Sequence, residues 1–257
     1  MTPIKDYALI GNCETAALIN PNGGIDWLCL PAFDAGSFFG ALLDEEKGGS
    51  WALHPVAPFR MERQYLGDSA ILETRFSTDR GVVKVTDFFV VARKANARFY
   101  DFTSLHSTAR LVRLVEAEAG SGVEMELQIS ARPDYARQAA EWRPSGSGAY
   151  TTKEATLFTN ANLRPIGDDL SGNLFAARDE RVFFVLVYNE ERRAPDLAMI
   201  DEWLRLTTAF WREWNLFNWS SAGAGWNGFN LLRKRFAELV TALARAQPID
   251  RFVARDL

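Results

Sequence analysis

Two short segments of this chain pair a carboxylate with an aromatic ring: Asp26 precedes Trp27, and Phe33 precedes Asp34. A carboxylate accepts hydrogen bonds from sugar hydroxyls, and an aromatic face suits the apolar C–H face of a pyranose. The pattern therefore predicts that these four residues form a substrate-binding edge for a carbohydrate. The sequence leaves a structural alternative open, in which Trp27 fills the core and Asp26 caps a turn.

Other residue types that carry chemistry lack the spacing they need. His54 and His106 have no Cys, His, Asp or Glu at a metal-ligand spacing, and no HExxH or CxxC motif occurs. No GxSxG motif is present, and the glycine-rich segments match neither a phosphate-binding loop nor a dinucleotide fingerprint. We therefore expect no metal and no cofactor. Cys13 and Cys29 are expected to be reduced and buried.

The composition is that of an ordinary globular protein, with 47% hydrophobic and 24% charged residues. At 257 residues the chain can form one large β domain or two small ones. The net charge is −4 and the one basic block is residues 233–235, so no nucleic-acid partner is expected. The N-terminus lacks the regions of a signal peptide and no apolar run reaches membrane-span length, so we expect a cytoplasmic protein without a membrane partner.

The elements that must position the acidic and aromatic pairs are strands. Residues 25–29 alternate, which places Ile25, Trp27 and Cys29 on one face of a strand that follows an Asn-Gly-Gly turn at 22–24. A short strand is expected before that turn as well. Asp26 is accordingly expected on the opposite face from Trp27.

Further strands follow at regular intervals. Residues 71–78 and 82–89 are predicted to form a hairpin. Residues 123–131 alternate between a packed and a solvated face, and a glycine-rich turn at 120–122 precedes them. The continuous apolar run 182–188 suits a strand covered on both faces. This pattern predicts a mainly β fold, an antiparallel sandwich.

The period becomes helical after Pro195. Apolar residues recur at three and four positions from Leu197 to Trp214, and Asp196 is placed to cap this helix. A polar link is expected over residues 215–225 and a second helix over 226–246. We therefore expect a β domain over residues 1–195 and a helical linker and tail over 196–257.

Several separated segments resemble, in order, the N-terminal domain of bacterial and archaeal glycoside hydrolases of the glucoamylase and trehalase kind, family fifteen. They are residues 6–11, 14–18, 24–31, 33–34, 65–74, 85–88, 111–113 and 132–135, with 211–214 resembling the family's exit helix. The resemblance implies a large antiparallel β super-sandwich followed by linker helices. In that family an (α/α)6 barrel comes next and cleaves α-glucosidic bonds with inversion, using two glutamates in barrel loops. No position of this chain corresponds to either glutamate, so no catalytic residue is carried over.

The chain departs from the family pattern at two places. Ala32 stands where the family has an Arg in the sequence Pro-Arg-Phe-Asp, which removes a five-donor side chain that could pair with a carboxylate or a sugar hydroxyl. After Trp226 the sequence no longer aligns with the family.

Three functions are compatible with these observations. The first is a non-catalytic accessory domain of a glucoamylase- or trehalase-like hydrolase, with an α-glucoside or oligosaccharide as substrate. The second is a stand-alone enzyme or carbohydrate-binding protein that uses the loops at 26–38 and 133–150. The third is a docking subunit, in which an apolar stripe on the second helix binds a separately encoded barrel or a second copy of the chain. That stripe consists of Phe229, Leu232, Phe236 and Leu239.

Overall fold

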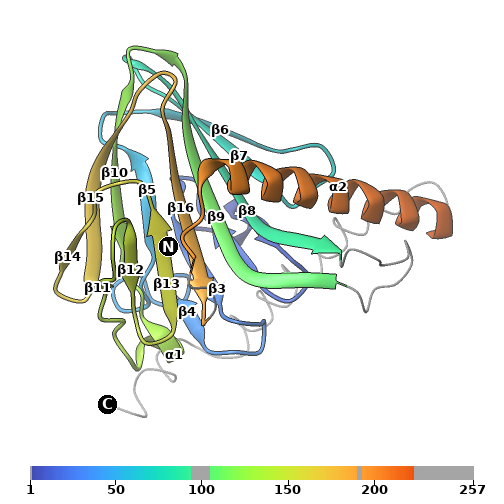
Figure 1. Cartoon of the computed structure of the whole chain (residues 1–257), viewed down its shortest axis with the longest axis horizontal. Coiled ribbons are helices and arrows are strands. Elements are labelled where there is room, and N and C mark those ends of the chain that lie inside the picture. Colours follow the sequence, from blue (N-terminus) through green and yellow to red (C-terminus); the bar gives the residue numbers. More distant parts are fainter. Residues whose placement is uncertain (1, 94–104, 190–192, 223–257) are drawn as a thin grey trace.

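The computed structural model describes residues 2–93, 105–189 and 193–222. Two eight-stranded antiparallel sheets pack face to face, and one long helix crosses the outside of the second sheet (Figure 1). The predicted mainly β sandwich is confirmed.

Sheet A has the strand order β1-β2-β3-β5-β10-β15-β14, with β4 paired to β3. Its strands are β1 (Ala8–Gly11), β2 (Ala16–Ile19), β3 (Ile25–Cys29), β4 (Ser37–Phe39), β5 (Trp51–Pro55), β10 (Val123–Ile129), β14 (Arg164–Ile166) and β15 (Asp169–Ala176). Sheet B has the order β11-β12-β13-β16-β9-β8-β7-β6. Its strands are β6 (Arg60–Tyr65), β7 (Leu72–Ser77), β8 (Gly81–Arg93), β9 (Leu105–Gly120), β11 (Arg143–Pro144), β12 (Ala149–Thr151), β13 (Ala155–Thr159) and β16 (Arg181–Tyr188). The helices are η1 (Ile4–Asp6) and α2 (Leu197–Ala222), and the short element α1 (Pro133–Ala136) is a turn with left-handed backbone.

The main core fills the space between the two sheets. Large side chains from both sheets meet there, including Trp51 of β5, Phe76 of β7 and Phe184 of β16. The rings of Trp51 and Phe184 pack edge to face, with centroids 6.2 Å apart. Aromatic side chains therefore form a large part of this core.

Most of the predicted strands are present. The strands on either side of the 22–24 turn are β2 and β3, and β7 pairs with β8 as the predicted hairpin. Along β10 buried and exposed residues alternate as expected. The turn at 120–122 joins strands of different sheets, because β9 pairs with β8 and β16, whereas β10 pairs with β5 and β15.

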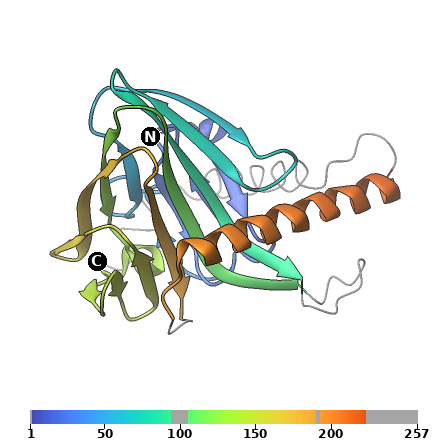
Figure 2. The ribbon, with the colours of Figure 1, turned by 45° about the horizontal axis from the view of Figure 1, so that its top comes forward.

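Helix α2 covers a second, smaller core on the outer face of sheet B (Figure 2). Ile200, Phe210 and Trp211 of the helix are buried in this cluster against residues of β8, β9 and β16. Strand β16 is therefore covered on both faces, as its continuous apolar run predicts. Asp196 Oδ1 accepts a hydrogen bond from Met199 N at 2.8 Å, so the predicted N-cap is confirmed.

One side chain of α2 completes the hydrogen bonding of β8. The pairing of β8 with β9 is irregular between Phe89 and Val91. The buried hydroxyl of Thr207 accepts a hydrogen bond from Val91 N at 3.2 Å and donates one to Val91 O at 3.3 Å. The helix thereby supplies the partners that an irregular strand pair would otherwise leave unmet.

The predicted polar link is wrong over residues 215–222, because α2 continues to Ala222. Asn215, which we expected to end the helix, is buried and donates from its side chain to Asp68 O, leaving the helical backbone bonds intact. The predicted second helix over 226–246, its apolar stripe and the basic block at 233–235 lie outside the described residues. The domain boundary at 195/196 remains a prediction.

Candidate functional site

The predicted sugar-binding edge begins at an irregularity in β3. Leu18 pairs with Trp27 and Ile19 pairs with Ile25, so Asp26 is an extra residue in the strand. Ile25 lies in the inter-sheet core, whereas Trp27 packs against a cluster of Tyr7, Leu18 and Leu42 on the other side of sheet A. The simple alternation predicted for residues 25–29 is therefore wrong. An extra residue shifts the alternation by one position, so Leu28 rather than Trp27 joins the core.

Asp26 is held by two side chains, those of Tyr7, just before β1, and Asn20, just after β2. Its Oδ2 atom accepts hydrogen bonds from the hydroxyl of Tyr7 at 2.7 Å and from Asn20 Nδ2 at 2.8 Å. Burial, together with the hydrogen bond to Asp26, raises the pKa of Tyr7 above its ordinary value, so this phenol stays a neutral donor. Asn20 Oδ1 in turn accepts hydrogen bonds from the backbone N–H groups of Asn22 and Gly24, which fixes the turn.

The loops at 26–38 and 133–150 meet beside Trp27. The rings of Trp27 and Tyr135 lie 6.3 Å apart, and Tyr135 N donates to Ser37 Oγ at 3.0 Å. Arg132 N, just before the second loop, donates to Phe38 O at 3.0 Å, which ties the two segments together through the backbone. Tyr135 is not among the predicted edge residues, although it falls within the family-like segment 132–135.

The loop at 133–137 has an unusual backbone. Asp134, Tyr135 and Ala136 all have positive φ, at 53°, 57° and 63°. L-residues pay roughly 1–2 kcal/mol each for a left-handed conformation, and such strain gathers at functional sites. Gly36 lies directly against this turn, because a Cβ there would sit 3.2 Å from the Cα of Asp134.

The other predicted edge residues are at the surface. Phe33 is 48% exposed and Asp34 is exposed, while the backbone N–H of Phe33 donates to Glu14 O at 2.9 Å. Asp26 and Trp27 are partly exposed. The structure thus gathers Trp27 with Tyr135, and it gives Asp26 the turn-holding contacts of the structural alternative.

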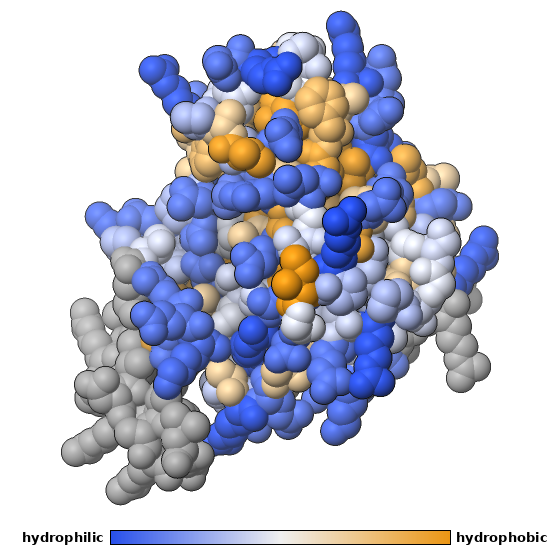
Figure 3. All heavy atoms as spheres, turned by 90° about the vertical axis from the view of Figure 1, so that its left-hand side faces the viewer, coloured by the Kyte–Doolittle hydropathy of each residue, from blue (hydrophilic) through white to orange (hydrophobic). Residues whose placement is uncertain are grey.

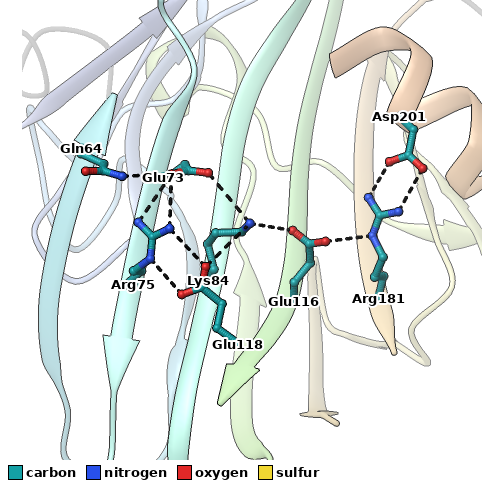
Figure 4. Close-up of polar contacts among 8 residues, drawn as sticks. All are labelled: Gln64, Glu73, Arg75, Lys84, Glu116, Glu118, Arg181 and Asp201. Atoms are coloured by element: carbon teal, nitrogen blue, oxygen red, sulfur yellow. Dashed lines mark hydrogen bonds and ion pairs between the residues drawn. The ribbon is translucent and has the colours of Figure 1, made fainter. Parts of the chain in front are cut away.

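A row of charged side chains crosses the part of sheet B's outer face beside α2 (Figure 4). Lys84 Nζ lies 3.1 Å from Glu116 Oε2, and Arg75 Nε lies 2.8 Å from Glu118 Oε2. Arg181 connects the row to the helix, with NH2 2.6 Å from Asp201 Oδ1. Because these charges pair with one another, this surface offers little to a charged ligand.

The outer face of sheet A on the β14 and β15 side is mostly hydrophilic (Figure 3). Within the described residues, no group of three or more His, Cys, Asp or Glu side chains could hold a metal ion. No helix in the described part of the chain is long and apolar enough to cross a membrane. Both cysteines are free thiols; Cys29 is buried, as predicted, and Cys13 is partly exposed.

Comparisons with known proteins give consistent results. The family model for "Trehalase-like, N-terminal" matches residues 1–155. A protein of Mycobacterium tuberculosis named trehalase is 32% identical over 233 residues, which is 82% of this chain and 34% of that protein. A trehalase of Mycolicibacterium smegmatis is 30% identical with the same coverage, and one of Thermoplasma volcanium is 25% identical over 221 residues.

The chain spans about a third of the length of these curated relatives. The family match covers more than half of the chain, and the resemblance seen in the ordered sequence segments agrees with it. This chain therefore belongs to the family of trehalase-like N-terminal domains.

Proposed function

We propose that residues 1–257 act as the non-catalytic β domain of a trehalase- or glucoamylase-like glycoside hydrolase whose substrate is an α-glucoside. The observation that carries the proposal is the coverage of the relatives. Proteins named trehalase match 82% of this chain with only about a third of their own length. The catalytic groups of such an enzyme are therefore to be sought in the portion that this chain does not match.

The geometry at the predicted edge supports a contact role in preference to catalysis. Glycoside hydrolysis requires a carboxylic acid and a second carboxylate on opposite sides of one glycosidic bond. Asp26 already accepts hydrogen bonds from Tyr7 and Asn20 on one oxygen. We propose that Trp27, Phe33 and Asp34, with Asp26 behind them, form the edge that contacts an α-glucoside or an oligosaccharide, in the cytoplasm.

The test is a hydrolysis assay of the chain alone on trehalose, maltose, maltotriose and dextran. No hydrolysis above the level of a buffer control is expected. The proposal is overturned if the chain cleaves any of these sugars and a single substitution of an acidic residue within 1–257 abolishes the cleavage. That result would make the chain a stand-alone glycosidase.

A further inference from the structure

A pocket of about 480 Å³ lies beside the loop that carries Tyr135. One wall is the segment from Pro133 to Arg143, and the other is the turn between β12 and β13, from Thr151 to Glu154. Arg143 of β11 pairs with Thr151 of β12, so a strand ladder joins the two walls. The pocket is thus a built feature of sheet B's edge.

The wall formed by the 133–143 segment is fixed by its own backbone bonds and by the core. Gln138 N donates to Pro133 O at 3.2 Å, and Ala140 N donates to Ala131 O at 3.2 Å. Trp142 is buried and packs edge to face against Phe38, with ring centroids 6.5 Å apart. The left-handed residues 134–136 reverse the chain between Pro133 and Gln138, both of which line the pocket.

The opposite wall is equally ordered. Thr152 N donates to Ala155 O at 2.8 Å. The hydroxyl of Thr152 accepts hydrogen bonds from the backbone N–H groups of Glu154 at 3.2 Å and Ala155 at 3.0 Å. Because both walls are held before any ligand arrives, binding would require little ordering of the protein.

The accessible surface of the pocket is mostly apolar, and polar side chains of both charges stand around it. Pro133 and Ala140, which are buried, are among the lining residues. Arg143 NH2 donates to Glu141 Oε2 at 2.6 Å on one wall, and Lys153 and Glu154 lie on the other. Two acids and two bases balance, so neither an anion nor a cation is favoured over a neutral molecule. Donors and acceptors together with apolar surface suit a ligand with many hydroxyls.

We propose that this pocket binds a neutral sugar of one or two pyranose rings, through hydroxyl contacts with Gln138, Glu154 and the Glu141–Arg143 pair. The volume falls within the roughly 300–1,000 Å³ of small-molecule sites. The choice of a sugar among neutral polyhydroxyl ligands rests on the proposed function. The location does not: this pocket is lined by none of the four residues Asp26, Trp27, Phe33 and Asp34.

The experiment measures binding of trehalose, maltose, glucose and glucose 6-phosphate to the full chain by protein-observed NMR titration. For the wild-type chain we expect saturable binding of trehalose or maltose with a Kd on the order of 1 mM. Gln138→Ala and Glu154→Ala should each weaken it about tenfold, through loss of hydrogen bonds to the sugar. Glu124→Ala, at an exposed position of β10, is the matched control and should leave the Kd unchanged. All three side chains are outside the core, and thermal melts check that each variant is folded.

Three results would overturn the proposal that this pocket binds a sugar. They are absence of saturable disaccharide binding to the wild-type chain, binding that is unaffected by both pocket variants, and tighter binding of glucose 6-phosphate than of glucose. Loss of binding on Phe33→Ala, with the pocket variants unaffected, would assign the sugar to the edge instead and would also count against the pocket. The hydrolysis assay decides the proposed function separately. Hydrolysis that Glu154→Ala abolishes would refute the accessory role and keep the pocket as a sugar site.

Discussion

The guanidinium of Arg113 donates from Nε to Asp87 Oδ1 at 2.8 Å, with both side chains essentially inaccessible to solvent. Its terminal nitrogens donate to Trp51 O at 3.2 Å and to Gly23 O at 2.5 Å. Arg113 and Asp87 belong to sheet B, whereas Trp51 and Gly23 belong to strand β5 and a turn of sheet A. The ion pair therefore ties the two sheets together and holds the turn that precedes Asp26.

Removing Arg113 should strongly destabilise the domain. Burial raises the pKa of Asp87 above its ordinary value and Arg113 opposes the rise, so Arg113→Ala leaves a buried carboxyl without its counter-ion. We expect a loss of about 3–5 kcal/mol in the free energy of unfolding, measured by urea denaturation. Arg75→Ala, in the partly exposed charge row, is the control and should cost less than about 1 kcal/mol.

A double substitution distinguishes the missing counter-ion from a general loss of packing. Arg113→Met with Asp87→Leu removes both charges and keeps apolar volume, so it should recover the part of the stability that Arg113→Ala loses through the unpaired carboxyl. The part that comes from the lost donors to Trp51 O and Gly23 O should stay lost. Equal losses for Arg113→Ala and Arg75→Ala would contradict the bridging role.

The two hydrogen bonds between the Thr207 hydroxyl of α2 and the Val91 backbone of β8 give a second prediction. Thr207→Val keeps the shape of the side chain but leaves the N–H and C=O groups of Val91 without the hydroxyl. The expected cost is about 1–3 kcal/mol, with faster hydrogen exchange at the Val91 amide. Thr208→Val is the matched control, because its hydroxyl donates only to Leu204 O of the same helix. If the Val91 amide exchanges its hydrogen at the same rate in both variants, these hydrogen bonds between Thr207 and Val91 are not formed in solution.

The two thiols predict an alkaline loss of stability. Burial raises the pKa of Cys13 and of Cys29 from the ordinary 9.0 to about 11. Between pH 9 and 11 the thiols of the unfolded chain ionise before those of the folded chain. The stability that the two protonated thiols contribute to the fold is therefore complete below pH 9 and is lost as the pH rises towards 11. Each thiol should account for about 2–3 kcal/mol across that window.

The measurement is the slope of unfolding free energy between pH 9 and 10, where the tyrosines with a raised pKa, Tyr7, Tyr135 and Tyr188, contribute less than the two thiols. A Cys13→Ala Cys29→Ala variant should show a clearly shallower slope over this interval, whatever its absolute stability, with the remaining slope due to the three tyrosines. A slope in the double variant as steep as in the wild type would rule out the thiols as its cause.

The left-handed turn predicts a stabilising glycine. Ala136 has φ 63°, so Ala136→Gly should relieve backbone strain and raise the unfolding free energy by about 0.5–1 kcal/mol after the entropy cost of glycine. Ala139 is not among the residues with positive φ, and Ala139→Gly should instead cost about 0.4–1 kcal/mol. Thermal unfolding of the two variants should therefore shift in opposite directions, and shifts of the same sign would contradict the turn geometry.

Where the sequence has a local hydrophobic pattern or a capping residue, the strand or helix can be predicted from it. The alternation along β10, the apolar run of β16 and the cap at Asp196 each depend on contacts that a local pattern specifies. Some of the family-like segments also contain residues that the fold requires. Asp87 and Arg113 lie in two of them, and their role is to join the sheets.

The candidate site is less predictable, because it depends on pairing. The extra residue at Asp26 exists only relative to the register of β2, so residues 25–29 alone predict the wrong face for Trp27. The turn at residues 134–136 contains no glycine, and Tyr and Ala rarely adopt positive φ. Contacts between the 26–38 and 133–150 loops join segments about a hundred residues apart, such as Tyr135 N with Ser37 Oγ. No local pattern contains that information.

The position of α2 has a consequence for the newly made chain. The apolar outer face of β8 and β9, which includes Phe88, Val90 and Val112, is covered by helix α2, which comes later in the chain. On the ribosome these residues emerge well before Phe210 and Trp211, which bury them. A nascent chain that has completed β8 and β9 must therefore keep this surface from other chains until α2 has left the exit tunnel.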